Sequence, residues 1–152
     1  MWEAPVQPNR TSVGLDVHAR SVVACGLDGQ SGRLFERRLC PDHTEIISWV
    51  RTLPGPVAVT YEAGPTGFGL ARFLAAEGIT CPVAATSMLQ RPAGDRVKTD
   101  VRDARHLARL LHLGEITAVV VPSVEQEAAR DLVRAREDVR GDLMSARHRL
   151  CV

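Results

Sequence analysis

The sequence predicts an α/β domain with a mixed five-stranded sheet flanked by helices, followed by a long helix with coiled-coil spacing. Three observations predict this class: three short β-type segments near the N-terminus, then alternating helix-type and strand-type segments, then an apolar seam in the last thirty residues. The 152 residues, 45% of them hydrophobic and 24% charged, are typical of one globular domain. This composition excludes a disordered or fibrous chain.

The N-terminal part predicts an antiparallel meander. Residues 1–11 are expected to form a flexible leader. Residues 12–17 and 21–27 are short, apolar and β-branched, and residues 33–40 alternate loosely between apolar and polar positions. The D-G-Q-S-G cluster at 28–32 is typical of a turn. Strands joined by such short connections pair in an antiparallel sense.

The middle of the chain alternates between helix and strand. We expect Thr44 to cap a helix that runs to Leu53, before the P-G-P turn. In order, the later segments are a strand at 57–61 that ends at Glu62, a helix at 68–77 closed by Gly78, a strand at 81–85, a loop or short helix at 86–98, a helix at 99–113 closed by Gly114, and a strand or extended link at 118–121. The apolar face of the 99–113 helix is expected to comprise Val101, Ala104, Leu107, Ala108 and Leu111. Alternating strands and helices of this kind pair in parallel, and the full order is that of the ribonuclease H fold.

The last segment, residues 122–152, predicts the start of a coiled-coil helix. Ser123 and Gln126 match the two positions of a capping box. Apolar residues then recur in steps of three and four, which is a heptad-like seam. The seam residues expected to mediate homo-oligomerisation include Leu132, Ala135, Val139, Leu143 and Leu150. Because the helical pattern runs to the last residues without a stop signal, we expect the natural protein to continue beyond Val152.

Four acidic residues stand where surface solvation is not the natural explanation. Asp16 and Glu62 end apolar strands, and Asp100 and Asp103 share a face in the first turn of a helix. Taken singly, each is explained by a strand exit, a turn or a helix cap. Taken together, they can converge if the first and fourth strands are neighbours. Converging carboxylates repel one another unless a cation neutralises them, and oxygen ligands favour Mg²⁺ or Mn²⁺. Two such ions would suit phosphoryl transfer on a polynucleotide.

Basic residues surround the third acidic motif. Residues 91–109 hold six basic and three acidic side chains, a local excess of three positive charges in a chain whose net charge is +1. We expect this stretch to position a phosphate backbone. The residues assigned to nucleic-acid binding are Arg91, Arg96, Lys98, Arg102 and Arg105. For Arg105, a solvated helix face is an equal alternative.

The remaining chemistry-bearing residues receive plainer interpretations. Because His18 follows Asp16 closely, a position near the metals is one alternative, but we interpret it as a bystander. Trp49 and Tyr61 are assigned to the core. The four cysteines form no C-x-x-C pair, so neither a zinc site nor a disulfide framework is expected, and the reduced thiols indicate a cytoplasmic protein. Apolar runs are too short to span a membrane.

The motifs resemble the N-terminal domain of the DEDD-type insertion-sequence transposases, the group that includes bridge-RNA-guided recombinases. The motifs that carry the resemblance are G-L-D-V-H at 14–18, Y-E-A-G-P-T-G at 61–67, K-T-D-V-R-D-A-R at 98–105, and V-P-S at 121–123 leading into the long helix. The resemblance implies a RuvC-like fold over 12–121, with the acidic tetrad on Asp16, Glu62, Asp100 and Asp103. It further implies a DNA substrate, possible guide RNA, a bacterial or archaeal host, and a C-terminal domain with a catalytic serine that this chain lacks.

Three alternatives remain at the level of sequence. A stand-alone nuclease resembling Holliday-junction resolvases would cleave DNA without a further domain. An actin-like ATPase would share the core fold, but Val17 and His18 occupy the positions of its small phosphate-binding loop. A non-catalytic nucleic-acid-binding oligomerisation domain would bind DNA or RNA without any activity.

Overall fold

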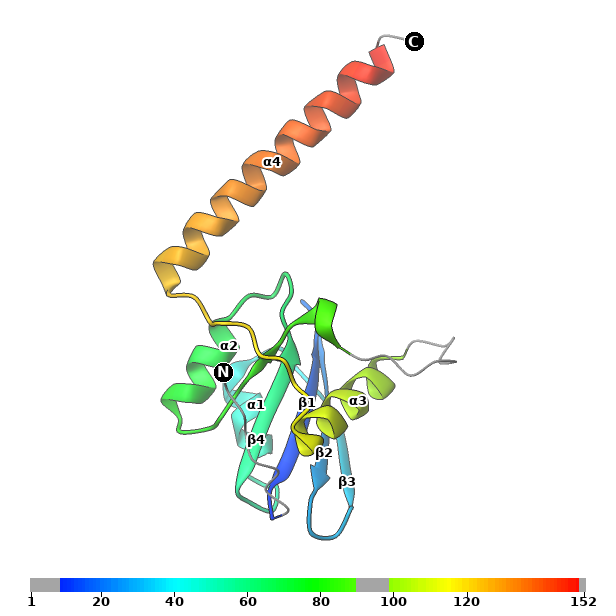
Figure 1. Ribbon diagram of the computed structural model, residues 1–152, viewed down its shortest axis with the longest axis vertical. Helices are drawn as coiled ribbons and strands as arrows, with labels where there is room; N and C mark the ends of the chain where they lie inside the picture. The colour runs from blue at the N-terminus through cyan, green and yellow to red at the C-terminus, as the bar shows by residue number, and fades with distance from the viewer. Residues whose placement is uncertain (1–8, 90–98, 151–152) are drawn as a thin grey trace. The chain divides into compact units, whose positions relative to one another are not determined.

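The computed structural model describes residues 9–89 and 99–150. The chain divides into two compact units, residues 1–121 and 122–152. The first unit is built on a five-stranded sheet with the order β3-β2-β1-β4-β5 (Figure 1). Its strands are β1 (Thr11–Val17), β2 (Val22–Asp28), β3 (Leu34–Leu39), β4 (Val57–Glu62) and β5 (Val83–Ala84).

The sheet is mixed, as the sequence predicts. β1, β2 and β3 pair in an antiparallel meander. β4 pairs in parallel with β1, with Leu15 opposite Tyr61, and β5 pairs in parallel with β4. Residues 118–121 form an extended link. It contacts the sheet through an isolated antiparallel bridge between Ala118 and Ala84 of β5. Because β1 and β4 are parallel neighbours, their carboxyl ends lie side by side at the same end of the sheet.

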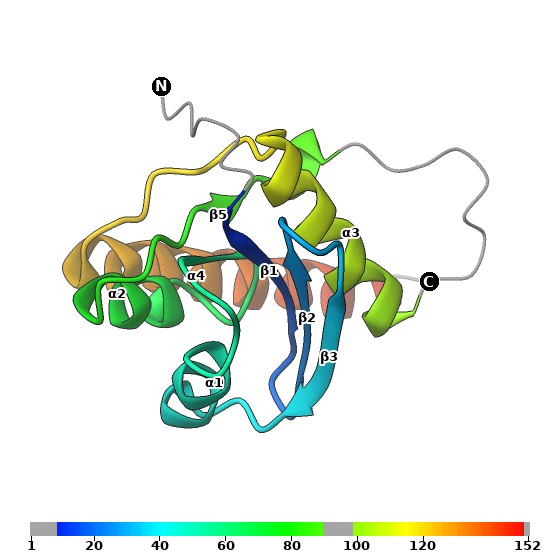
Figure 2. The same cartoon turned by 90° about the horizontal axis from the view of Figure 1, so that it is seen from below.

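Helices cover both faces of the sheet (Figure 2). α1 (His43–Val50) and α2 (Gly69–Ala76) lie on one face, and α3 (Asp100–Leu113) lies on the other. Because successive side chains of a strand point to opposite faces, Val13 and Leu15 join the core under α1 and α2, whereas Gly14 and Asp16 face α3. The same alternation places Val59 and Tyr61 of β4 in that core. This α1/α2 core also contains the predicted core residue Trp49.

α3 packs unusually close to β1 because β1 carries a glycine at the point of contact. A Cβ atom on Gly14 would lie 2.1 Å from the Ala104 carbonyl oxygen and 2.5 Å from the Ala108 backbone nitrogen. Ala104 and Ala108 are themselves fully buried and form a small cluster with Val23 and Cys25 of β2. Small residues on both sides therefore set the position of α3 relative to the end of β1.

Helix ends follow the predicted chemistry at some sites and not at others. Gly114 closes α3 with φ of 74°, as expected, and Gly78 adopts φ of 77° after α2. Thr99, predicted as the first residue of this helix, is its N-cap instead. The prediction for Thr44 was wrong: Asp42 is the N-cap of α1, and its carboxylate accepts hydrogen bonds from both the backbone N–H and the hydroxyl of Thr44. A carboxylate two residues earlier is the better acceptor for the free N–H groups at the start of the helix.

Two predicted extents also need correction. α1 ends at Val50, and Leu53 lies in the following turn, although it is still buried. Val101 is 37% exposed and does not belong to the buried face of α3. It lies in the first turn, at the margin of the stripe that Ala104, Leu107 and Leu111 bury.

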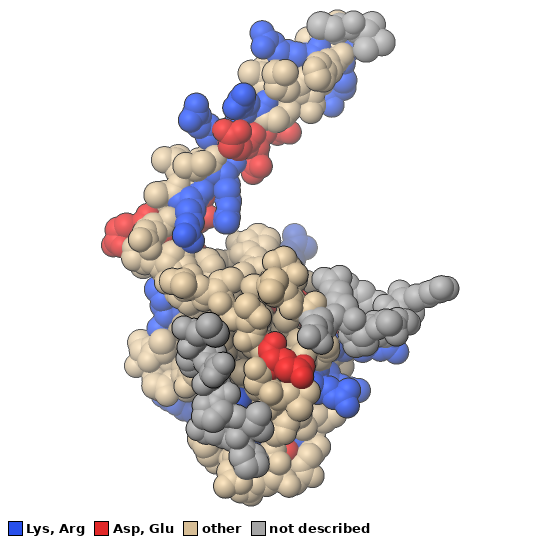
Figure 3. Space-filling view, viewed as in Figure 1, with Lys and Arg blue, Asp and Glu red and all other residues tan. Residues whose placement is uncertain are grey.

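The second unit is one continuous helix, α4 (Val124–Leu150). Its capping box is confirmed: the Ser123 N–H donates to Gln126 Oε1 at 3.1 Å, and the Gln126 N–H donates to Ser123 Oγ at 3.2 Å. Basic and acidic side chains both occur along the helix (Figure 3). Its large apolar side chains, including Leu132, Val139 and Leu143, are exposed in the single chain. No helix within residues 9–89 and 99–150 combines the length and apolar character needed to cross a membrane.

Candidate metal centre

Asp16 and Glu62 end neighbouring parallel strands on the same face of the sheet. Gly14 is aligned with Thr60 and Leu15 with Tyr61, so the next position along the register sets Asp16 beside Glu62. Parallel neighbours are about 4.8 Å apart, and both residues follow an α1/α2-facing residue in alternation. Both side chains are half-buried at the strand ends. The positions of Asp16 and Glu62 at the strand ends, together with the register of β1 and β4, therefore direct both carboxylates toward the space beside α3.

The first turn of α3 supplies the other two predicted acids. Thr99 precedes it as the N-cap, with Oγ1 accepting from the Arg102 N–H at 3.4 Å. Asp100 lies one turn before Ala104, which contacts β1 at Gly14, so Asp100 is held near the end of β1. Two acidic side chains in this turn also suit the positive end of the helix dipole.

Asp16 and Asp100 meet at the end of β1, and His18 lies between them. A carboxylate oxygen of each acid and a ring nitrogen of His18 all lie within 4.8 Å of one another. His18 Nε2 is 3.0 Å from Asp16 Oδ2 and 3.9 Å from Asp100 Oδ1. The side chains of Asp16 and Asp100 are 20% and 44% exposed, so solvent and ligands can reach them. The sequence places His18 close to Asp16, whereas its proximity to Asp100 follows from the packing of α3 on β1.

Glu62 and Asp103 lie outside this group of three. Asp103 is half-buried and lies one helical turn before Leu107. Leu107 belongs to a hydrophobic cluster that also contains Ala58 of β4. Asp103 therefore lies on the β4 side of the first turn of α3, whereas Asp100 lies on the β1 and β2 side. Glu62 ends β4 on that same side of the sheet. The four predicted acids thus occupy the facing ends of β1, β4 and α3.

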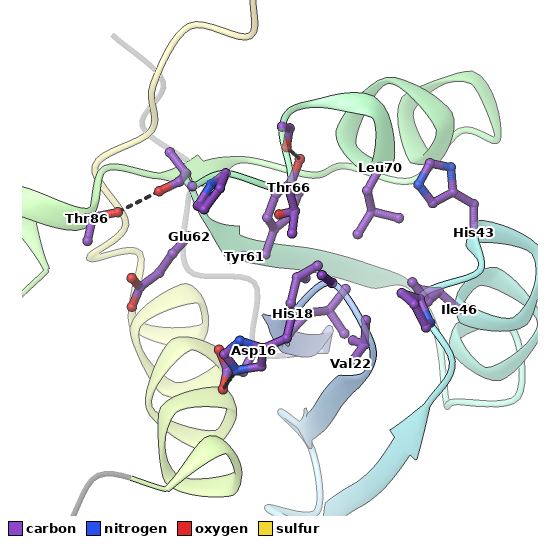
Figure 4. A pocket seen from close by; sticks show the side chains of 18 residues that line it. Asp16, His18, Val22, His43, Ile46, Tyr61, Glu62, Thr66, Leu70 and Thr86 are labelled. Atoms are coloured by element: carbon purple, nitrogen blue, oxygen red, sulfur yellow. Dashed lines mark hydrogen bonds and ion pairs between the residues drawn. The ribbon is translucent and has the colours of Figure 1, made fainter. Parts of the chain in front are cut away.

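A pocket of about 670 Å³ adjoins the acids (Figure 4). Asp16, His18 and Glu62 line it together with apolar residues from the core below α1 and α2. The loop after β4 is held in place by two hydrogen bonds, from the Tyr61 hydroxyl to the Gly67 carbonyl at 3.1 Å and from Thr86 Oγ1 to the Ala63 carbonyl at 2.8 Å. The site is therefore an open hollow at the strand ends, where α/β sheets commonly bind ligands.

Basic residues reach the site from the edge strand. Arg38 of β3 is paired with Val23, which faces α3, and its Nη2 atom lies 3.7 Å from Asp100 Oδ2. Arg38 was not among the residues selected from the sequence. Alternation along β3 would have placed it on the face toward α3, but only with knowledge of the strand order. Arg105 also faces β3, where its guanidinium donates to Glu36 Oε1 and this ion pair raises the pKa of Arg105.

The predicted nucleic-acid residues are therefore placed unequally. Arg102 is exposed in the first turn of α3. Arg105 forms an ion pair with Glu36 of β3, a contact between elements that neither sequence alternative for Arg105 includes. Arg91, Arg96 and Lys98 lie outside the described residues.

The donor set fits a divalent metal ion. Carboxylate oxygens are the preferred ligands of Mg²⁺ and Mn²⁺, and two of them are brought together here at the exposed ends of β1 and α3. Among the described residues, the side chains of His18 and Arg38 lie within ion-pair distance of these acids. The three described cysteines are free thiols and take no part in the group.

Comparisons with known proteins converge on one family. The family model of the IS110-type DEDD transposases, described as "Transposase", matches residues 13–151. A putative transposase y4qE of Sinorhizobium fredii is 60% identical over 76 residues, which are 50% of this chain and 20% of that protein. The transposase for insertion sequence element IS1533 of Leptospira borgpetersenii is 34% identical over 143 residues, 91% of this chain. The matched region spans 41% of that relative, so the chain covers less than half of either protein.

Proposed function

Because the chain belongs to the IS110-type DEDD transposases, we propose that residues 12–121 form the metal-dependent catalytic domain of a DNA transposase. Asp16, Glu62, Asp100 and Asp103 are the proposed metal ligands and catalytic acids. The observation that carries the proposal is the meeting of Asp16 and Asp100, which are 84 positions apart in the sequence, at the end of β1. Both acids are only partly buried and neither belongs to the core of the described residues, so core packing does not account for their meeting.

The proposed chemistry is phosphodiester cleavage and strand transfer. Mg²⁺ or Mn²⁺, in one or two ions, would supply Lewis-acid stabilisation of the oxygens at the scissile phosphate. Asp16 and Glu62 hold their carboxylates rigidly because each ends a paired strand of the sheet. Asp100 and Asp103 are held by the close contact of α3 with Gly14. Rigid elements of this kind preserve the spacing of ligands better than loops do.

Basic side chains near the acids would position the nucleic acid. Arg38 and Arg102 are exposed beside the ends of β1 and α3. We propose that they contact phosphates, together with Arg91, Arg96 and Lys98 from the segment before α3. Guanidinium groups suit this role because they bind phosphate oxygens in a bidentate manner. For Arg105 we propose first a structural role, because its ion pair with Glu36 links α3 to β3.

Complete transposition needs more than this domain. A serine from a C-terminal domain, a guide RNA and an oligomer are expected from the family resemblance, and the chain spans less than half of its relatives. The helix α4 supports the oligomer part of this proposal, because its seam residues Leu132, Val139, Leu143 and Leu150 are exposed in the single chain. The seam would join copies of the protein and so bring two catalytic domains to one DNA.

Metal binding tests the proposal directly. We expect isothermal titration of the 152-residue chain with Mn²⁺ to show binding that weakens at least about tenfold in Asp16→Asn and Asp100→Asn, because each loses a charged ligand. Asp131→Asn, which removes an exposed acid of α4, is the matched control and should bind as the wild type does. Equal affinity in all four proteins would contradict the metal centre and favour a non-catalytic nucleic-acid-binding domain.

A further inference from the structure

His18 is held in place by the backbone but has no role in the core. It follows β1 directly, and its N–H donates to the Ser21 carbonyl at 3.0 Å, which closes the turn between β1 and β2. Its side chain is 51% exposed and belongs to none of the hydrophobic clusters. Burial therefore does not explain why the imidazole turns toward Asp16 and Asp100.

The separations of His18 Nε2 from the two carboxylates lie in the range found between ligands of one ion. Ligands about 2.1 Å from an octahedral metal ion are about 3.0 Å apart when adjacent and about 4.2 Å apart when opposite. The separations from His18 Nε2 are 3.0 Å to Asp16 and 3.9 Å to Asp100. A hydrogen bond to Asp16 alone would account for the shorter distance, but it would not require Asp100 to lie near the same nitrogen.

We propose that His18 is a ligand of the metal centre through Nε2, so that one ion is held by a nitrogen and by carboxylate oxygens. This inference rests on the proposed metal-dependent function and identifies a ligand that the acidic tetrad does not include. Imidazole nitrogen favours Mn²⁺ over Mg²⁺, whereas an all-carboxylate site discriminates less between them. The centre should therefore bind Mn²⁺ more tightly than Mg²⁺, and this preference should depend on His18.

Electron paramagnetic resonance can detect the nitrogen without any activity assay. The 152-residue chain is loaded with Mn²⁺ alone, and electron spin echo modulation is recorded for the wild type, His18→Ala and His18→Gln. Glutamine retains a hydrogen-bond donor toward Asp16 but lacks the imidazole nitrogen. The matched control is His148→Ala, which removes an exposed histidine of α4. Circular dichroism of each variant checks that the fold is unchanged.

We expect nitrogen modulation in the wild type and in His148→Ala, and its loss in both His18 variants. Titration should show Mn²⁺ affinity reduced about tenfold or more in both His18 variants, and the preference for Mn²⁺ over Mg²⁺ reduced with it. Bound Mn²⁺ without nitrogen modulation in the wild type would overturn the inference and leave the carboxylate site intact. Wild-type affinity in His18→Ala would also overturn it, since the imidazole would then contribute nothing to metal binding. Absence of Mn²⁺ binding in the wild type would overturn the proposed function itself, and the ligand role with it.

Discussion

At the scale of single residues, successive side chains of β1 point to opposite faces of the sheet, one of which forms the core and the other the candidate site. Val13 and Leu15 are fully buried under α1 and α2, whereas Gly14 and Asp16 face α3. Because Gly14 has no side chain, α3 can pack close to β1. This close packing brings Asp100 of α3 near Asp16 of β1. One short strand thus supplies the core, the contact with the helix and the first acid of the site.

Gly14→Ala should destabilise the first unit strongly. The new Cβ would overlap the Ala104 carbonyl oxygen and the Ala108 nitrogen, which are backbone atoms and cannot rotate away. We expect a loss of at least about 3 kcal/mol in the free energy of unfolding, measured by urea denaturation. Gly64→Ala is the control, since its Cβ would meet no atom closer than 3.9 Å, and it should change stability by less than about 1 kcal/mol. Similar effects of the two substitutions would contradict the close packing of α3 on β1.

Two thiols in the domain should resist alkylation. Burial raises the pKa of Cys25 to about 11 and that of Cys81 to about 12, and Glu36 contributes to the rise at Cys25. At pH 8 the thiolate fraction is then lower than for a free cysteine by about a hundredfold or more. Peptide mapping after iodoacetamide treatment should find both residues unmodified in the native protein and modified in urea. Rapid native labelling of Cys25 would show that the β2 face under α3 opens readily.

At the scale of elements, the start of α1 depends on an acidic cap. The Thr44 hydroxyl and N–H lower the pKa of Asp42, so its ionised form is stabilised in the folded protein. This contribution is complete above the unfolded pKa of about 3.9 and is lost as the pH falls through the lower folded value. Asp42→Asn keeps a good cap that does not titrate, so it should reduce the loss of stability below about pH 4. Urea unfolding between pH 2 and 6 measures this, and identical pH profiles for both proteins would refute it.

The elements themselves were predictable because their signals are local. The closing glycine at Gly114 and the capping box at Ser123 were predicted, since each acts on its own helix end. The Asp42 cap was missed because two candidate residues lay only two positions apart and the better acceptor was the earlier one. Short runs of apolar residues correctly placed the carboxyl ends of β1 and β4.

Contacts between distant elements were not predictable in the same way. Arg38 meets Asp100, and Arg105 meets Glu36 across 69 positions, because β3 forms the sheet edge beside α3. No periodicity along the chain reports which strand is the edge or which of its faces a later helix covers. His18 was interpreted as a bystander for the same reason: its proximity to Asp100 depends on how closely α3 approaches β1.

At the scale of the whole molecule, α4 should drive self-association. Its seam residues, including Leu132 and Val139, are exposed in the single chain, and their spacing suits a coiled coil. We expect size-exclusion chromatography with light scattering to show an oligomer that dissociates on dilution. Val139→Glu, on the seam, should weaken association at least tenfold. Val133→Glu replaces an exposed valine off the seam and is the matched control, and equal effects of the two would contradict association through the seam.

The central claim is that the carboxylates at the ends of β1, β4 and α3 converge on divalent metal ions. The most direct measurement is a crystal soaked in Mn²⁺, with anomalous density sought among Asp16, Glu62, Asp100 and Asp103. We predict one or two ions bound by these carboxylates, lost in a crystal of Asp16→Ala. Absence of anomalous density, with Glu62 or Asp103 directed away from Asp16, would contradict the claim.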